Sequence, residues 1–338
     1  MPPSCPFPNC TETALSFSSS CWAHTDKAVY LSLLQNALRR TQKEALPLNL
    51  KKVRCENIDF SHLNIPDTNF SQVSFVNCHF VGTTISNSNM IGARFESCDF
   101  IGSDLSGAHL TKAVISGCSF SHSDLRHAYL AEAHLKDADF LGALLFGCIL
   151  WNADLGGAKN LKKSNFQDPD KPNQENAARL LERDALVARE SYRIVKHYLH
   201  ESGLYEDASW AAYRELTMER KYFLKSKNPK FIPSLLMDGL SGYTEKPQRV
   251  IVSSLVIVLL FGLIYFLLNV PTRLNEIGRA SLWESIYFSF MTFTTVGYGD
   301  LTPRPVFWYQ MLACAEAFSG PFMAGLYIFT LTRRYAAG

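Results

Sequence analysis

The sequence predicts a multi-domain chain in which an α-helical membrane domain, made of two spans and a shorter helix between them, is fused to a right-handed quadrilateral β-helix and a helical linker. Three observations lead to this fold class. Two long apolar stretches lie near the C-terminus, a five-residue repeat fills residues 51–160, and an apolar stripe with helical spacing lies between them. The 338 residues are enough for several domains.

The two apolar stretches are predicted to cross a membrane. Residues 250–270 carry no charge and residues 306–331 carry only Glu316, and each stretch can span ~30 Å of hydrocarbon. Lys246 and Arg249 precede the first stretch, and Arg333 and Arg334 follow the second. The positive-inside tendency therefore places both termini in the cytosol. Because residues 1–25 lack the apolar stretch of a signal peptide, we expect an integral protein of the plasma (cell inner) membrane.

A helical, aromatic segment at 281–294 lies between the spans and leads into six residues of special pattern. They are Thr295, Val296, Gly297, Tyr298, Gly299 and Asp300. In this position they resemble the signature sequence of potassium channels, so that 249–338 corresponds to a pore domain with a pore helix and a selectivity filter. The resemblance implies a homotetramer that conducts K⁺, because each subunit supplies a quarter of the oxygen cage that replaces the ion's water. Glycines suit such a segment because they lack a Cβ.

The resemblance also implies that Tyr298 points away from the ion and packs on aromatic residues of the pore helix. These supporting residues are Trp283, Tyr287 and Phe288. Some relatives place a Glu nine positions before the filter Asp, where the two carboxyls share a hydrogen bond. This chain has Met291 there, and Tyr287 is the predicted substitute donor to Asp300.

The second span contains the predicted gating hinge. It comprises Gly320, Pro321 and Gly325, since proline removes a helical hydrogen bond and favours a kink. Glu316 in the same span has two interpretations. It is a protonated carboxyl bonded behind the pore helix, to Ser289 or Thr292, or it belongs to the ion path. The sequence has no ladder of Arg residues at every third position, so we expect no voltage sensor of the familiar kind.

The five-residue repeat predicts the β-helix. Every fifth residue from Phe60 to Leu155 is large and apolar, and a small residue often stands two positions earlier. This pattern resembles the pentapeptide-repeat family, in which four repeats make one coil with both positions inside. Cysteines one coil apart (Cys78, Cys98 and Cys118) are predicted to stack as core thiols, with a metal ladder as the alternative. The 51–160 segment has 11 acidic and 8 basic residues, which is too balanced for DNA mimicry and indicates a spacer or docking surface.

The N-terminal residues 1–25 contain a candidate metal site. Its ligands are Cys5, Cys10, Cys21 and His24, a set that suits tetrahedral Zn²⁺. So short a segment needs the metal to fold. Unpaired thiols and a disulfide are the alternatives. A helix from about Asp26 to Ala45 is expected within the connecting segment 26–50.

Residues 165–230 are predicted to form a helical hairpin. The apolar stripe of its first helix is Leu181, Ala185, Ala188, Tyr192, Val195 and Leu199. With its A-x3-Y and G-L-Y-x2-A patterns, the hairpin resembles one tetratricopeptide unit. Gly203 should end the first helix, and the second should cover Ala208–Leu224. A single hairpin cannot bury its own apolar face, so we expect it to pack on the β-helix or on a neighbouring subunit.

Positive charges precede the first span. They are Arg220, Lys221, Lys225, Lys227 and Lys230, and they either attract anionic lipid headgroups or are simply solvated. An interfacial slide helix is predicted for 231–248. Its apolar stripe is Ile232, Leu235, Leu236, Leu240 and Tyr243.

Together these features predict a potassium-selective channel subunit that is gated at the inner helices under control of a cytosolic domain. A net charge of +2 excludes general nucleic-acid binding, which needs a basic surface, and no enzymatic activity is expected. The alternatives are a less selective cation channel of the same architecture and a membrane-tethered scaffold with a vestigial pore. The intact filter sequence argues against the scaffold.

Overall fold

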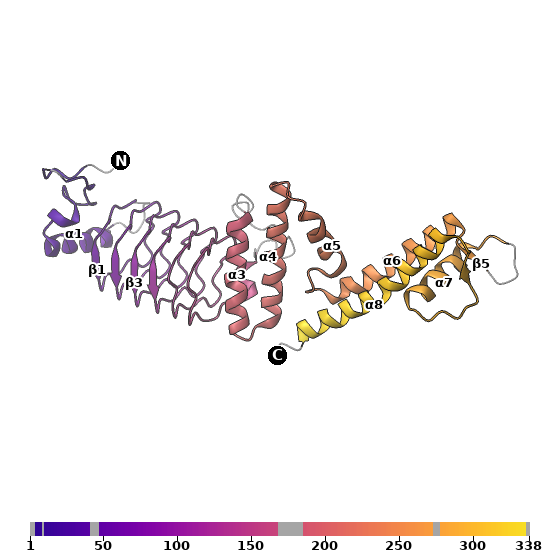
Figure 1. Cartoon of the computed structure of the whole chain (residues 1–338). Helices are drawn as coiled ribbons and strands as arrows, with labels where there is room; N and C mark the ends of the chain where they lie inside the picture. The colour runs from indigo at the N-terminus through magenta and orange to yellow at the C-terminus, as the bar shows by residue number, and fades with distance from the viewer. Residues whose placement is uncertain (1–3, 9, 41–46, 168–184, 273–277, 336–338) are drawn as a thin grey trace. The chain divides into compact units, whose positions relative to one another are not determined.

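The computed structural model describes residues 4–8, 10–40, 47–167, 185–272 and 278–335 (Figure 1). By its internal contacts the chain divides into two compact units, Met1–Tyr222 and Phe223–Gly338. The first unit holds the β-helix with the elements that cover its two ends, and the second holds the apolar helices.

The β-helix is built from coils of 20 residues, in which each side is paired in parallel with the same side of the next coil. Isolated bridges run from Asn49↔Asn69 to Asp139↔Lys159. One side extends into short strands in the order β1-β2-β3-β4. Their bounds are β1 Arg54–Glu56, β2 Ser74–Val76, β3 Arg94–Glu96 and β4 Val114–Ser116. The predicted β-helix with four repeats per coil is thereby confirmed.

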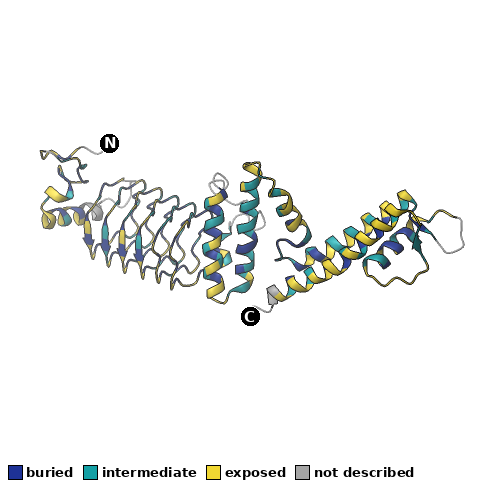
Figure 2. Ribbon diagram, in the orientation of Figure 1, coloured by how far each residue is buried: buried dark blue, intermediate teal, exposed yellow. Residues whose placement is uncertain are grey.

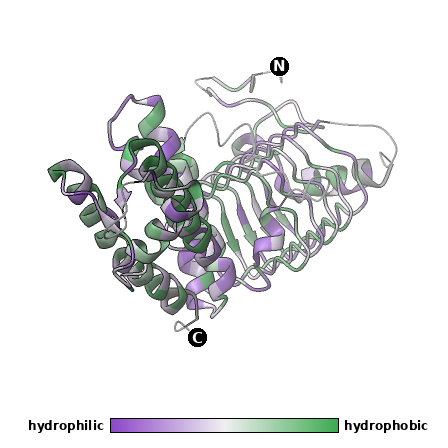
Figure 3. Ribbon diagram, turned by 90° about the vertical axis from the view of Figure 1, so that its right-hand side faces the viewer, coloured by the Kyte–Doolittle hydropathy of each residue, from purple (hydrophilic) through white to green (hydrophobic). Residues whose placement is uncertain are grey.

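The interior of the β-helix is filled by the two inward positions of each repeat. Hydrophobic and hydrophilic residues alternate along the coils (Figure 3), and the large and small inward side chains are almost fully buried. One column of rings is Phe60, Phe80, Phe100, Phe120 and Phe140, with neighbouring centroids 4.7 to 5.6 Å apart. The cysteine column is buried too, and Cys78 and Cys98 donate to backbone carbonyls of the preceding coil. This arrangement is that of core thiols.

Helices cover both ends of the β-helix. At the N-terminal end, η1 (Trp22–His24) leads into α1 (Lys27–Arg40), whose Tyr30 and Leu34 join the same hydrophobic core as the coils. The prediction extended this helix to Ala45, but residues 41–46 lie outside the described residues. The helix begins where expected because Asp26 accepts hydrogen bonds from the amides of its first turn.

At the other end, η2 (Lys163–Phe166) precedes the hairpin of α3 (Ala185–Glu201) and α4 (Tyr205–Lys225). Val195, Leu199 and Ala208 belong to the core cluster of the β-helix, so of the two expected partners the hairpin packs on the β-helix. Leu181 lies in 168–184, outside the described residues. Gly203 adopts a φ of 72° after α3, and α4 starts three residues before the predicted Ala208.

The second unit contains the two candidate membrane spans. They are α6 (Pro247–Leu268) and α8 (Phe307–Tyr335), and both are largely exposed in Figure 2. Between them lie β5 (Pro271–Thr272), α7 (Leu282–Phe293) and β6 (Thr302–Pro303), with β5 antiparallel to β6. The helix α7 begins with a capping box between Ser281 and Glu284, a signal that the sequence analysis did not use.

The predicted slide helix 231–248 is too long. The observed helix, α5, covers Phe231–Ser241, and Gly242 ends it in a left-handed conformation, as is common at helix C-termini. Tyr243, which was predicted on the apolar stripe, lies beyond the end of α5, is buried, and shares a hydrogen bond of 2.7 Å with Ser234. Three members of the predicted stripe, Ile232, Leu235 and Leu236, are exposed on α5, together with Met237.

Candidate functional site

The filter sequence follows directly from the C-terminal end of α7. The amide of Val296 donates to the carbonyl of Met291 over 3.1 Å, so the filter starts from a fixed helix end. The φ angles of Thr295, Gly297 and Gly299 are 57°, 51° and 78°, whereas Val296 and Tyr298 are not left-handed. Such alternation turns successive carbonyls toward one side of the chain.

Glycine is needed in this segment because of the backbone conformation and not because of space. A Cβ added at Gly297 or Gly299 would meet no atom within 4 Å in the single chain. Their φ angles lie in the region that L-residues with a side chain avoid. A substitution there would therefore act on the backbone of the filter itself.

The predicted aromatic support of the filter is not assembled within one subunit. Tyr298 and Trp283 are 75% and 78% exposed, and Phe288 packs instead on Tyr265, with centroids 5.2 Å apart. Tyr287 lies close enough to the Asp300 carboxylate to interact with it electrostatically, and its role as the substitute donor stays a prediction. The filter and the first turn of α7 thus each present one large uncovered ring.

Behind α7, three buried side chains from three helices meet. The Tyr265 hydroxyl of α6 donates to Oε2 of Glu316 in α8 over 2.6 Å, and Ser289 of α7 makes a very short hydrogen bond to Oε1 of Glu316. All three side chains are inaccessible to solvent. Of the two interpretations of Glu316, the structure supports a carboxyl behind the pore helix, and its α7 partner is Ser289.

The hydrogen-bond count indicates which oxygen of this group carries the proton. Ser289 also lies 2.8 Å from the carbonyl oxygen of Val258, which can only accept. A hydroxyl has one hydrogen, so Ser289 uses it on Val258 and must accept from Glu316. Glu316 is therefore a neutral acid that donates from Oε1 and accepts from Tyr265 at Oε2, as the sequence analysis expected of a carboxyl in this place.

The predicted hinge residues have different environments. A Cβ on Gly320 would overlap the backbone carbonyl of Phe293 at the end of α7, whereas one on Gly325 would meet nothing within 4 Å. Pro321 lies inside α8, where it removes one backbone hydrogen bond. Gly320 is thus needed because α8 approaches α7 closely at this position. This explains the glycine without requiring that the helix bend there. Gly262 of α6, which the sequence analysis missed, approaches Ile286 of α7 in a similar way.

The structure brings the four N-terminal ligand residues together. The Sγ atoms of Cys5 and Cys21 lie 3.5 and 3.3 Å from Nδ1 of His24, and those of Cys10 and Cys21 are 3.7 Å apart. With Zn–S of about 2.3 Å and Zn–N of about 2.0 Å, the edges of a tetrahedral site are about 3.5 to 3.8 Å long. The set Cys5, Cys10, Cys21 and His24, called the Cys₃His site below, therefore fits zinc. The cysteines are free, which does not agree with a disulfide.

Local contacts prepare this site for a metal. Phe7 stacks on His24, with centroids 4.4 Å apart. Burial alone would raise the pKa of the Cys5 thiol, but hydrogen bonds from the backbone of Cys21 and Phe7 and from His24 lower this pKa to about 6. Thiolate is the form of cysteine that binds metal.

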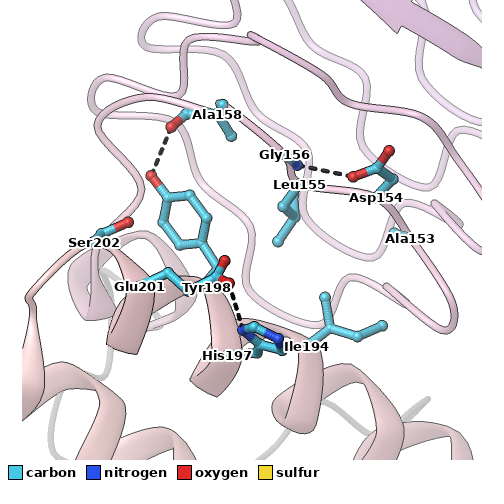
Figure 4. A pocket seen from close by; sticks show the side chains of 11 residues that line it. Ala153, Asp154, Leu155, Gly156, Ala158, Ile194, His197, Tyr198, Glu201 and Ser202 are labelled. Atoms are coloured by element: carbon cyan, nitrogen blue, oxygen red, sulfur yellow. Dashed lines mark hydrogen bonds and ion pairs between the residues drawn. The ribbon is translucent and has the colours of Figure 1, made fainter.

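The joint between the β-helix and α3 contains a cleft of about 400 Å³. Figure 4 shows its wall, where the Tyr198 hydroxyl donates to the carbonyl of Ala158 over 2.8 Å. His197 lies 3.4 Å from Glu201. These polar groups satisfy one another, so the cleft is interpreted as part of the joint that holds the hairpin on the last coil.

The basic residues before the first span occupy the C-terminal turns of α4 and the connection to α5. They are Arg220, Lys221, Lys225, Lys227 and Lys230. The apolar face of α5 follows them directly in sequence. The helix α5 is fixed to α6, since Arg249 donates to the side chain of Asp238 over 2.6 Å and to its carbonyl over 2.9 Å.

Comparisons with known proteins agree with the two halves of this architecture. A family model described as "Ion channel" matches residues 253–337. Models described as "Pentapeptide repeat region" and "Pentapeptide repeats (8 copies)" match residues 48–119 and 123–159. The comparison with curated proteins gave no match.

Solved structures of pentapeptide-repeat proteins are similar to part of the chain. A trypsin-treated form of QnrB1, a plasmid-mediated fluoroquinolone resistance protein, shares 19% identity over 34% of this chain and 73% of its own, with a TM-score of 0.27. The protein alr5209 from Nostoc Pcc 7120 shares 20% identity over 41% of this chain and 93% of its own, with a TM-score of 0.22. These scores are low, and the repeat models and the coils themselves carry the assignment. The chain therefore joins an ion channel domain of the two-span potassium-channel type to a domain of pentapeptide repeats.

Proposed function

We propose that this protein is one subunit of a potassium-selective channel that assembles as a homotetramer. The observation that carries the proposal is the conformation of Thr295–Asp300. Left-handed residues alternate with others at the end of a short helix between two spans. Four such segments around an axis would surround a dehydrated K⁺ with carbonyl oxygens. The C-terminal dipole of α7 adds partial negative charge at the start of the filter.

Exposure of one aromatic side chain of the filter and one of α7 supports assembly. Tyr298 and Trp283 are rings of large apolar area that a lone subunit leaves uncovered. Burying rings of this size contributes strongly to association. Fourfold closure would bring the filter of one subunit next to the pore helix of another and would cover both rings.

We propose that the channel lies in the plasma membrane with both termini in the cytosol, where the β-helix would influence the gate. The described route from the cytosolic domain to the pore passes through α5, which the Arg249–Asp238 ion pair fixes to α6. The basic residues of 220–230 would attract anionic headgroups beside the apolar face of α5. Gating itself is assigned to the inner helices, at Pro321 and Gly325.

The test of selectivity is a reversal-potential measurement on reconstituted protein under K⁺ and Na⁺ gradients. K⁺ should permeate far better than Na⁺, and Gly297→Ala should abolish the preference. Gly239→Ala is the matched control, because Gly239 lies in α5 with no atom within 4 Å of its Cβ position. Equal permeability of the unmodified protein would favour the less selective cation channel, and absence of flux would favour the scaffold.

Zinc is the metal that we propose for the Cys₃His site. Four protein ligands leave no open position, so the ion would be structural and would supply folding energy. Elemental analysis of the purified protein should give one zinc per chain, and Cys10→Ser should remove it. Zinc content that does not change in this variant would refute the assignment.

A further inference from the structure

The Cys₃His site lies beside the point where the N-terminal segment contacts the first coil of the β-helix. A β-helix must end in coils that have no neighbour on one side, and their backbone groups need other partners. Residues 12–16, called the docking loop below, take this place. The amide of Ser16 donates to the carbonyl of Asn49 over 3.0 Å, and its hydroxyl accepts from the Asn49 amide over 2.8 Å.

Side chains strengthen the contact of the docking loop. Asn49 is buried, and its Nδ2 donates to the hydroxyl of Thr13 over 3.1 Å and to the carbonyl of Ala14 over 2.5 Å. Glu12 binds the ammonium groups of Lys51 and Lys52 over 2.8 and 2.5 Å. Every one of these partners belongs to the start of the first coil.

The metal ligands enclose the docking loop. Cys10 precedes it and Cys21 follows it, and their Sγ atoms are 3.7 Å apart. Cys5, the third cysteine of the site, is tied directly to the docking loop, because its backbone amide donates to the carbonyl of Glu12. The docking loop has little core of its own, because its buried Leu15 packs with residues of α1 and the coils. Without the ligand bonds, closing this loop would cost conformational entropy that few internal contacts offset.

We propose that metal bound at the Cys₃His site locks the docking loop onto the first coil, so that occupancy of the site decides whether this end of the β-helix is closed. The inference rests on the zinc binding proposed above. Loss of the metal releases the loop and exposes the backbone edge at Asn49, while the coils farther along keep their neighbours.

Hydrogen exchange of the full-length protein, zinc-loaded or treated with a zinc chelator, tests the lock. Peptides covering residues 12–20, and the amide of Asn49 that donates to the Ser16 hydroxyl, should exchange at least about tenfold faster after zinc removal, whereas peptides covering 98–140 should not change. Cys10→Ser should reproduce the chelator effect. Cys314→Ser, a change of an exposed cysteine outside the site, is the matched control.

Asn49→Ala separates docking from metal binding. It removes the bonds to Thr13 and Ala14, and also the one that Oδ1 accepts from Asn69 of the next coil. It touches no metal ligand, so it should speed exchange in 12–20 while zinc remains at one per chain. If zinc is present and its removal leaves residues 12–20 and the Asn49 amide protected, the lock is refuted and the zinc assignment stands. If the protein binds no zinc, the zinc assignment and the lock are both refuted. Faster exchange that includes 98–140 would mean global unfolding and would also contradict a local lock.

Discussion

Replacing Glu316 by leucine should loosen α7 and impair the filter, since Glu316 joins three helices behind it. The side chain accepts from Tyr265 and donates to Ser289. In Glu316→Leu, the buried hydroxyl of Tyr265 loses its partner, which costs about 1–3 kcal/mol in a protein interior, although hydrogen bonds between membrane helices average only about 0.6 kcal/mol. Because both hydrogen bonds of Glu316 are lost, we expect the free energy that stabilises the folded pore domain to fall by about 1–3 kcal/mol.

Glu316→Gln is the conservative control for the proton count. The amide of glutamine can donate to Ser289 and its oxygen can accept from Tyr265, as the neutral acid does. This variant should keep wild-type selectivity and stability. Glu316→Leu combined with Tyr265→Phe should recover part of the loss, because replacing both partners of a buried pair by apolar groups is far less costly than removing one.

The assays are the K⁺/Na⁺ permeability ratio and the thermal dissociation of the solubilised assembly. Thr330→Val removes another buried hydroxyl, which bonds within its own helix to Tyr327, and should leave selectivity unchanged. If Glu316→Gln proves as damaging as Glu316→Leu, the carboxyl acts through its charge and is not the neutral acid described above. If Glu316→Leu leaves both the permeability ratio and the dissociation temperature unaltered, the hydrogen bonds of Glu316 do not support the filter.

Four further predictions test the other parts of the molecule. Native mass spectrometry in detergent should give about four times the 38.0 kDa chain mass, and a predominant monomer or dimer would contradict fourfold assembly. Ala138→Leu, inside the β-helix, should cost about 1–3 kcal/mol by overpacking, whereas the exposed neighbour Asp137→Asn should be nearly neutral; equal shifts in melting temperature would disprove the register. Gly320→Ala should reduce assembly and flux through overlap with the end of α7, while Gly325→Ala should leave assembly intact, as size-exclusion chromatography would show. Deleting 1–230 should leave selectivity intact but change the open probability at fixed voltage, and an unchanged open probability would mean that the cytosolic domain serves assembly or localisation alone.

The sequence predicted the elements whose patterns repeat along the chain. The β-helix follows from its five-residue period, since each repeat places the same two positions inside, as the buried column from Phe60 to Phe140 shows. The spans and the filter follow from apolar length and from the glycines between them. The four ligands of the Cys₃His site are close together in the chain, so their spacing alone indicated a common centre.

Apart from the bond between Glu316 and Ser289, the contacts between distant segments could not be predicted in this way. Tyr265 and Glu316 are 51 residues apart, and no local pattern pairs them. Position 320 must be glycine because a Cβ there would overlap the backbone of Phe293. This overlap depends on how α8 crosses α7, which the periodicity of the sequence does not reveal. The end of α5 was different, because Gly242 followed by Pro247 is a recognisable stop and start of helices that the sequence analysis did not apply.

The two contacts of α8 with α7 also indicate where the inner helix can move. Glu316 and Gly320 both hold α8 against α7, by hydrogen bonding through Ser289 and by close approach at Phe293. Pro321 comes immediately after them, so the missing backbone bond lies where the fixed part of α8 ends. We therefore expect bending to begin at Pro321 and to move only the part of α8 beyond it. The part before Pro321 would stay with the pore helix, and the filter would keep its geometry while the gate opens.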